Sequence, residues 1–417
     1  MTEPDHDAVR RILMVSYWYP PAVGAASERV AAFARHLPDH GWETHVLTAR
    51  RVPAPAERAG VEVHAIPDRF ASKGQTFADY DPRQRPSRLQ PWLRDLVFPD
   101  RFVGWQRRAL GAGLEIVRRR GADVILASFP PASAVQLALQ LHRRTGVPLV
   151  LDFRDRWFGP GGYIPRRAQA RRAHEELQRE AVAATTSIVT ISDAMADAIA
   201  DEHLYPRRRI AVISNGFDAD RPRPERRSPD AERIFTIAHV GTVIPRNRPD
   251  LFFASVAAWK LRGGPNRVRF RFVGNLSKDY LRSAGLDDVV ETTGLVPRDR
   301  ALQEMADADA LLLLTGRYVG RWGHNAKLFE YLAAGRPILC LEESPPSNDR
   351  TLLESVAPER SFFAAVDDPA ALAVAVAAVR AWLDAPEATA TATVPNIEAF
   401  SRARLTAALA DHLRERF

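Results

Sequence analysis

The sequence predicts an α/β protein made of two domains, each with a parallel sheet covered by helices. Its 417 residues exceed what one hydrophobic core usually supports. Short apolar runs alternate along the chain with longer amphipathic segments, which is the pattern of successive βα units. A proline-rich and charged segment, residues 220–229, interrupts this alternation, and the same pattern then starts again.

The N-terminal part contains the apolar runs expected of buried parallel strands. They lie at residues 11–16, 44–48, 61–66, 123–128, 149–153, 187–192 and 209–213. The predicted helices cover residues 28–37, 105–120 and 166–184, with others within 129–148 and from Asp193. Pro20 and Pro21 enforce an extended loop before the first helix, and Gly24 belongs to a run of small residues there. Small residues let a substrate approach the backbone, and they equally allow a helix to pack tightly on a strand.

Residues 70–100 are polar, broken by prolines and rich in arginine, and they end in a short amphipathic patch before Pro99. The apolar residues of this patch are Leu89, Trp92, Leu93, Leu96, Val97 and Phe98. We interpret the patch as a helix folded onto its own domain. A peripheral contact with a membrane or a lipid-linked acceptor is the second interpretation, because basic and aromatic residues suit a membrane interface.

The C-terminal part repeats the alternation of strands and helices. Its predicted strands lie at residues 234–240, 268–273, 289–290, 310–315 and 338–341. Three predicted helices cover residues 299–307, 369–383 and 397–415. Three others are predicted to end at Lys260, Gly335 and Val356. We therefore expect an N-terminal domain over residues 1–220, a linker over 221–232 and a C-terminal domain over 233–396, with a ligand in the cleft between them.

Residues 320–337, GRWGHNAKLFEYLAAGRP, carry the clearest chemistry. A predicted loop with Gly320 and Gly323 precedes a helix that ends at Gly335, and such a loop can bring the backbone close to a ligand. The free amides at the start of the helix, with Lys327 in its first turn, favour a phosphate. Glu330 can accept hydrogen bonds from two neighbouring hydroxyls, as a ribose offers. The alternative is that Lys327 and Glu330 are a solvated pair on an ordinary helix.

Charged residues crowd the end of the predicted strand at residues 149–153, in the segment DFRDRW. Open α/β sheets bind ligands at the carboxyl ends of their strands. Asp152, Arg154 and Asp155 are therefore candidate catalytic residues. The alternative is that these charges pair with one another and only close the loop.

Composition and charge exclude several classes. The formal net charge of +7 suits phosphorylated ligands, an anionic membrane surface or nucleic acid, but no basic motif interleaved with aromatic residues favours nucleic acid. Cys340 is the single cysteine, so the chain has neither a disulfide framework nor a cysteine zinc site. The N-terminus is polar, and no apolar run is long enough to span a membrane. We expect a cytoplasmic protein, with peripheral contact at the inner face of the membrane as the variant.

An ordered set of segments resembles the bacterial glycosyltransferase family 4. These segments are RILMVSYWYPPAVGAASERV, PDRFVGW, DVILASFPPAS, VPLVLDFRDRW, IVTISDAM, ISNGFD, HVGT and KLFEYLAAGRPIL. The resemblance implies the GT-B fold, two Rossmann-like domains facing across a cleft, and a C-terminal helix, residues 397–417, that packs back on the N-terminal domain. It also implies retaining, metal-independent transfer from a nucleotide sugar, with no cofactor.

The resemblance assigns roles to individual residues. Glu330 corresponds to the second glutamate of the family's E-x7-E motif, which binds the ribose, and Arg248, with Arg246 as the alternative, to a basic residue near the donor. The full set of donor-binding residues that it implies is Glu330, Lys327, Asn325, His324, Arg248, Gly241, Gly24 and Val296. The sequence departs from the family at Trp322, where the first glutamate would stand, and at Arg154, which replaces a frequent active-site histidine.

A retaining transfer without a metal needs the leaving diphosphate neutralised by cations and helix N-termini. If the acceptor hydroxyl attacks on the face that the diphosphate leaves, no enzyme nucleophile is required. Asp152 and Asp155 are then candidates to position or deprotonate the acceptor, which is a glycan, a lipid-linked molecule or a small natural product. Two alternatives stay open: a catalytically silent protein that binds nucleotide sugars, and a GT-B relative that does non-glycosidic chemistry. The base and sugar of the donor are not specified.

Overall fold

The computed structural model describes residues 9–22, 24–49, 58–68, 95–159, 163–219, 234–264, 267–385, 394 and 396–417. The described residues form two compact units. Unit 1 consists of the described residues up to Asn215, with Arg402–Phe417 added from the C-terminal end, and unit 2 lies within Gly216–Ser401. No described helix is long and apolar enough to cross a membrane.

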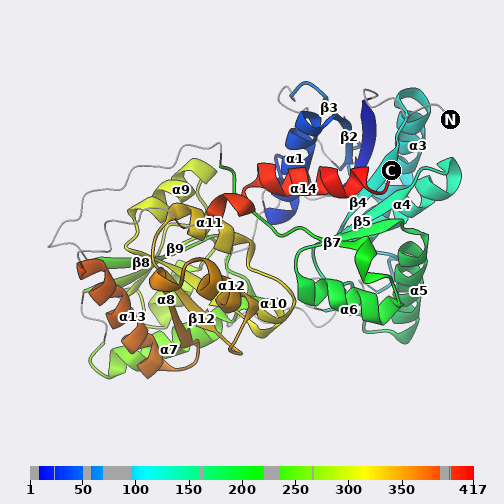
Figure 1. Ribbon diagram of the computed structural model, residues 1–417. Helices are drawn as coiled ribbons and strands as arrows, with labels where there is room; N and C mark the ends of the chain where they lie inside the picture. Colours follow the sequence, from blue (N-terminus) through cyan, green and yellow to red (C-terminus); the bar gives the residue numbers. More distant parts are fainter. Residues whose placement is uncertain are drawn as a thin grey trace. The chain divides into compact units, whose positions relative to one another are not determined.

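Unit 1 is built on a parallel sheet with strand order β3-β2-β1-β4-β5-β6-β7 (Figure 1). The strands are β1 (Arg10–Val15), β2 (Trp42–Thr48), β3 (Val61–Ala65), β4 (Val124–Phe129), β5 (Leu149–Phe153), β6 (Ser187–Thr190) and β7 (Ile210–Val212). All described pairings between them are parallel. Its helices are α1 (Ala25–His36), α3 (Val103–Arg120), α4 (Ala132–Thr145), α5 (Ala168–Ala184), α6 (Asp193–His203) and α14 (Arg402–Arg414).

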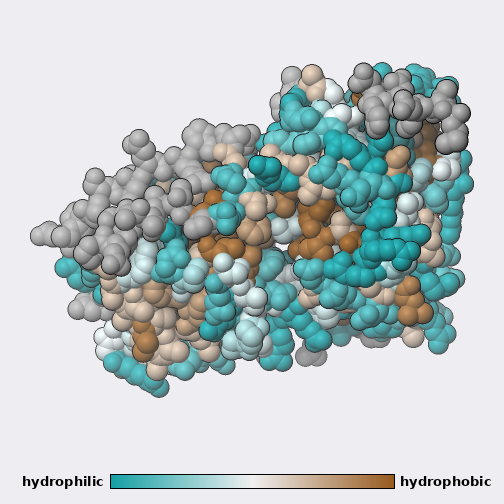
Figure 2. All heavy atoms as spheres, viewed as in Figure 1, coloured by the Kyte–Doolittle hydropathy of each residue, from teal (hydrophilic) through white to brown (hydrophobic). Residues whose placement is uncertain are grey.

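Both faces of this sheet are buried, which explains why its strands read as nearly continuous apolar runs. Successive residues of β1 point to opposite faces, so Leu13 packs in the cluster that includes α4, and Ile12 packs in the one that includes α1. The C-terminal helix α14 belongs to the second cluster, through Leu409, Ala410 and Leu413. On the face drawn in Figure 2, hydrophilic residues predominate over unit 1.

Unit 2 has a second parallel sheet, with strand order β10-β9-β8-β11-β12-β13. The strands are β8 (Phe235–Val240), β9 (Val268–Val273), β10 (Val290–Thr292), β11 (Ala310–Thr315), β12 (Ile338–Glu342) and β13 (Ser361–Ala365). The helices are α7 (Pro249–Leu261), α8 (Lys278–Ser283), α9 (Arg298–Asp307), α10 (Arg317–Trp322), α11 (Ala326–Ala334), α12 (Asn348–Val356) and α13 (Pro369–Asp384). Two parallel-sheet α/β units therefore confirm the predicted fold class.

The structure differs from the sequence-based expectations at several elements of unit 2. Gly320 lies in the short helix α10 rather than in a loop, and a Cβ there would meet the Cβ of Ser347 at 2.8 Å. Strand β13 and helix α8 were not predicted. The predicted final helix is two helices, the 3-10 helix η6 (Ile397–Phe400) and α14, because Ser401 between them is extended.

Most of the amphipathic patch before Pro99 lies outside the described residues. Of its members, Leu96, Val97 and Phe98 are described, and they are 60%, 40% and 40% exposed. The ring of Phe98 lies 5.3 Å from that of His174 on α5 of the same unit. The helix folded onto its own domain therefore stays a prediction, and the membrane contact stays its alternative.

Candidate functional site

The strand order of unit 2 marks one edge of its sheet for ligand binding. β8 and β11 are neighbours, but the chain leaves them toward opposite ends of the sheet. Open α/β sheets bind ligands beyond the carboxyl ends of the strands at such a switch point. Here those ends are followed by Gly241 after β8 and Gly316 after β11. The region around these two glycines is therefore the first place to look for a site.

Helix α11 begins at this edge, and its N-cap residue does not cap it. An asparagine that caps a helix places its side-chain oxygen on a first-turn amide, but Asn325 makes no such bond. Its side-chain amide instead donates to Asp349 Oδ2 at 2.6 Å and to Thr315 Oγ1 at 3.1 Å. Asn325 therefore does not cap the start of α11. A helix N-terminus that binds an anion requires first-turn amides that no side chain caps.

Asp349, on α12, is the centre of the hydrogen-bond network that holds this helix start. Its carboxylate is fully buried, and it accepts from Thr315 Oγ1 at 2.7 Å and from the backbone amide of Asn325 at 3.0 Å. His324 Nδ1 lies 3.4 Å from the same carboxylate, and Asn247 donates to Asn325 Oδ1 at 3.0 Å. His324 and Asn325 therefore position the backbone, and their predicted contact with a donor would come from main-chain amides.

Lys327 lies in the first turn of α11 and points back to the end of β8. Its Nζ is 2.8 Å from Nε2 of the buried His239, whose Nδ1 lies 3.1 Å from the carbonyl oxygen of Leu312. His239 thus donates from Nδ1 and accepts from Lys327 at Nε2. Burial, with the nearby positive charge of Arg246, lowers the pKa of Lys327 to about 7. Burial also places the pKa of His239 well below its ordinary value, so this imidazole is neutral.

Gly241 leaves the space that Lys327 occupies. A Cβ at this position would lie 3.3 Å from both Cε and Nζ of Lys327, and the φ of Gly241 is +127°. Both observations disfavour any other residue at the turn. Among the described residues, no ion pair joins Lys327 to a carboxylate. The turn at Gly241 thus makes room for the amine of Lys327 at the switch point.

Arg248 is held by carboxylates. It is the N-cap of α7 with a φ of +54°, and its guanidinium donates to Asp250 at 3.0 Å and to Glu343. The hydrogen bond to Asp250 is the main cause that raises the pKa of Arg248. Two carboxylates therefore already balance its charge, and Arg246 is the arginine whose charge acts on Lys327.

Glu330 lies on α11, one turn beyond Lys327, and is ion-paired. Arg298, at the start of α9, donates to Glu330 Oε1 at 2.6 Å, and the same guanidinium nitrogen lies 3.6 Å from Asp218. The Glu330 side chain is 15% exposed. Val296, two residues before Arg298, is half-buried against the apolar cluster that contains Leu328. Glu330 and Lys327 thus lie on the same helix, and Val296 packs against the apolar cluster to which this helix contributes.

In unit 1 the predicted catalytic residues join a buried polar network. Asp152 has no exposed surface, and Arg29 on α1 donates to its Oδ1 at 3.0 Å. Ser128 donates to Asp152 Oδ2 at 2.9 Å, and Arg154 Nε donates to Ser128 Oγ at 2.9 Å. Burial lowers the pKa of the Arg154 guanidinium. Asp152 is enclosed and both of its oxygens accept hydrogen bonds, which favours a positioning role. The catalytic role expected from the sequence stays a prediction.

Asp155 and Gly24 differ from Asp152 in being partly exposed. Asp155 lines a small recess with Arg156, Trp157 and Gln178. Gly24 is the N-cap of α1 with a φ of +130°, and a Cβ there would meet nothing within 4 Å. The roles predicted for these two residues stay predictions.

Several residues of these networks are not among the site residues predicted from the sequence. Asp349 lies 24 positions along the chain from its partner Asn325, and Arg298 lies 32 positions from Glu330. Arg29 lies 123 positions from Asp152. Only their charge, in segments that otherwise contribute to a buried core, is a signal in the sequence.

Comparisons with known proteins bear on this arrangement. Residues 24–216 match the family model of the glycosyl transferase 4-like domain, and residues 234–381 match that of glycosyl transferases group 1. A search of curated proteins finds no match to the chain.

Solved structures resemble the chain at low sequence identity. Sucrose-phosphate synthase from Thermosynechococcus elongatus has a TM-score of 0.59 at 13% identity, over 98% of this chain and 95% of that one. The lipopolysaccharide outer core galactosyltransferase WaaB, in its apo form, has a TM-score of 0.58 at 12% identity, over 98% of this chain and 100% of that one. TarM has a TM-score of 0.52 at 14% identity, over 73% and 58%. At such identities the likeness shows the fold alone.

Proposed function

Because the chain belongs to glycosyltransferase family 4 and has the GT-B fold, we propose that it transfers a sugar from a nucleotide-diphosphate donor to an acceptor hydroxyl with retention and without a metal. Unit 2 is assigned the donor and unit 1 the acceptor. The acceptor is a glycan, a lipid-linked molecule or a small natural product.

One observation supports the donor assignment. Lys327 lies in the first turn of α11, and the N-cap residue of this helix, Asn325, does not cap it. A diphosphate bound there accepts from the first-turn amides of α11 and pairs with Lys327. Arg246 adds a second positive charge, as its effect on the pKa of Lys327 indicates. This charge supports a metal-independent reaction, because cations and helix dipoles aimed at the leaving diphosphate can stabilise it as it departs.

Glu330 supports the nucleotide end of the same assignment. Its distance along α11 from Lys327 places a carboxylate one turn from the phosphate-binding end. The ion pair with Arg298 fixes the carboxylate through Oε1. A ribose with two neighbouring hydroxyls then donates to this carboxylate, while Arg298 keeps it oriented.

The proposed chemistry needs no nucleophile from the protein. The glycosidic bond to the diphosphate breaks as the acceptor oxygen bonds to the anomeric carbon from the same face, and the acceptor proton passes to the departing phosphate oxygen. Lys327 and the α11 amides stabilise the charge that develops on that oxygen. Asp155 is the partly exposed carboxylate that we assign to orient the acceptor.

A thermal-shift experiment tests the donor site. We expect one nucleotide among UDP, GDP, dTDP, ADP and CMP, or its sugar conjugate, to raise the melting temperature of the wild type and not of Glu330→Ala. A ligand at about 100 times its Kd stabilises the folded state by about 2.7 kcal/mol. Glu354→Ala, an exposed carboxylate on α12 of the same unit, is the control and keeps the shift. A shift that survives in Glu330→Ala would place the ribose elsewhere.

The pH dependence of donor binding tests Lys327. A bound diphosphate favours the charged amine and raises its pKa from about 7, so binding takes up a proton above that pH. Affinity for a nucleotide-diphosphate sugar is therefore expected to fall about tenfold or more between about pH 6.5 and about pH 8.5. Lys327→Arg stays charged and gives a flat profile. Calorimetry with the sugar conjugate is suitable, since its diphosphate diester does not titrate in this range, and equal slopes for both proteins would refute the assignment.

A silent nucleotide-sugar-binding protein is the second candidate function, favoured by Trp322 at the position of the missing glutamate. Trp322 ends α10, and the guanidinium of Arg321 lies 4.6 Å from its ring centroid. Nucleotide binding that depends on Glu330, without hydrolysis or transfer from any sugar conjugate, would support this candidate.

A further inference from the structure

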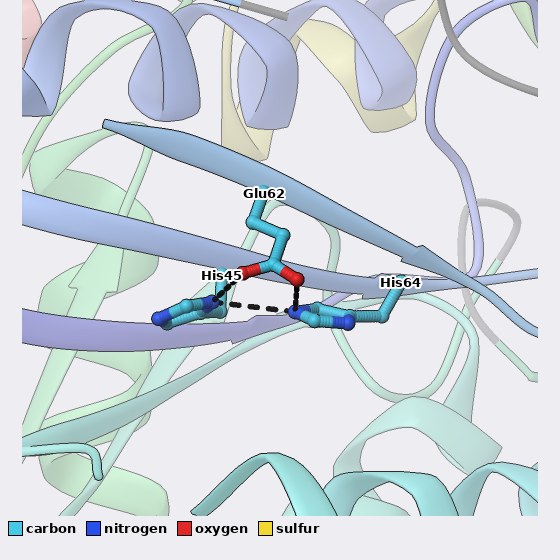
Figure 3. Close-up of side chains that lie close together, drawn as sticks. All are labelled: His45, Glu62 and His64. Atoms are coloured by element: carbon cyan, nitrogen blue, oxygen red, sulfur yellow. Dashed lines mark hydrogen bonds and ion pairs between the residues drawn. The ribbon is translucent and has the colours of Figure 1, made fainter. Parts of the chain in front are cut away.

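Three potential metal ligands lie together on unit 1, and none of them is among the residues assigned above. They are His45 on β2 and Glu62 and His64 on β3 (Figure 3). The parallel register pairs His45 with Glu62 and Leu47 with His64, so residues two apart on each strand share one face. β3 stands at one end of the strand order of its sheet. The cluster therefore joins an edge strand to its neighbour.

The donor atoms have the spacing of a metal site. His45 Nδ1 lies 3.2 Å from His64 Nε2, and the two oxygens of Glu62 lie 3.6 Å from His45 Nδ1 and 3.8 Å from His64 Nε2. Tetrahedral zinc with bonds of about 2.0–2.1 Å holds its nitrogen and oxygen ligands roughly 3.3 Å apart. Figure 3 shows the two ring nitrogens facing each other and the carboxylate of Glu62 turned toward both. Small movements would place all three around one ion.

The far side of His45 faces a carboxylate, although no hydrogen bond joins the two groups. Its Nε2 lies 3.4 Å from Glu43 Oε1, and Arg11 donates to the other oxygen of Glu43 at 3.1 Å. A proton on Nε2, facing this carboxylate, leaves the lone pair of Nδ1 directed at His64 and Glu62. His45 itself has no exposed surface, so its ring orientation is fixed by packing.

An ion can reach the cluster from outside. The side chains of Glu62 and His64 are 44% and 20% exposed. This opening leaves room for a water as the fourth ligand. Arg120 at the end of α3 is the competing cation, with Nη2 3.3 Å from Glu62, and it is itself 55% exposed. An exposed ion pair of this kind contributes little free energy, so a metal ion can replace Arg120 as the partner of Glu62.

We propose that His45, Glu62 and His64 bind a divalent metal ion of the zinc class, which fastens the edge strand β3 to β2. Two imidazoles and one carboxylate favour zinc, whereas magnesium and calcium take ligands that are all oxygen. The site lies in unit 1 and is independent of the proposed donor site in unit 2.

Zinc titration of the full chain, freed of metal by a chelator, tests the proposal. The wild type is expected to bind one zinc ion per chain and to gain thermal stability on binding. His64→Gln and Glu62→Gln are expected to weaken binding at least about tenfold. His203→Gln, on α6 of the same unit, is the matched control and keeps wild-type affinity. Cobalt in place of zinc should give the visible absorption of a tetrahedral site in the wild type and the control only.

His45→Gln is not needed for the test, since replacing a fully buried ring can disturb folding. Glu62 and His64 are partly exposed, so the two chosen variants are expected to fold, which circular dichroism verifies. No stoichiometric binding by the wild type would overturn the proposal. Binding that is equal in the wild type, His64→Gln and Glu62→Gln would overturn it as well.

Discussion

Lys327→Met is expected to lower the turnover of sugar transfer by about a hundredfold to a thousandfold, the usual effect of removing one group that stabilises transition-state charge. The amine is 2.8 Å from His239 and beside the turn at Gly241, where the leaving diphosphate is proposed to bind. Because the charge on the diphosphate grows as the sugar leaves, the loss should fall more on kcat than on KM. Steady-state kinetics with the donor identified by thermal shift measure it.

Stability separates this loss from misfolding. Burial lowers the pKa of Lys327 to about 7, so the folded state holds its proton less tightly than the unfolded state does. Between that pH and the ordinary lysine value of about 10.4, the unfolded state binds more protons, and stability rises with pH. Replacing the amine by the apolar Met is then expected to leave the melting temperature at neutral pH unchanged or raised. Lys260→Met, which removes an exposed pair with Asp288, should keep full turnover. Full turnover in Lys327→Met would contradict the proposed role.

The sequence predicts the layers of this fold well because burial leaves a direct mark on composition. β11 is an uninterrupted apolar strand, and α11 has apolar residues at helical spacing with Gly335 as its C-cap at a φ of +68°. β13 was missed because its sequence, SFFAA, is short and only partly buried. The sequence does not predict α10 because Gly320 indicates a loop, whereas in the structure Gly320 lies in a helix that packs closely against Ser347.

The site is less predictable because its polar contacts join distant residues. Asn325 is expected from the resemblance to bind the donor, and only the structure shows that its side chain hydrogen-bonds to Asp349 and does not cap α11. The resemblance implies that Glu330 and Arg248 contact the donor, but it does not show their partners. Glu330 pairs with Arg298, and Arg248 pairs with Asp250 and Glu343. A sequence shows which charges exist, but pairing depends on strand order and on the register of packed elements.

Asp152→Asn is expected to lower the free energy of unfolding of unit 1 by about 3 kcal/mol, because it leaves the Arg29 guanidinium buried without its counter-charge. The pair is almost fully enclosed, with 4% and 0% of the two side chains exposed, and Arg29 also donates to the carbonyl of Ser214 at 2.7 Å. Denaturant unfolding measures the change. Asp197→Asn, which breaks an exposed pair with Arg207, is the control and should cost less than about 1 kcal/mol.

A double-mutant cycle distinguishes a positioning role from a catalytic one. Replacing both members, Arg29→Met with Asp152→Asn, removes the buried charge together with its partner, so the double variant should be more stable than Asp152→Asn alone. If Asp152 only positions α1 against β5, turnover per folded molecule should return in the double variant along with stability. If Asp152 takes the acceptor proton, the double variant should be stable and still inactive, and that result would support the predicted catalytic role.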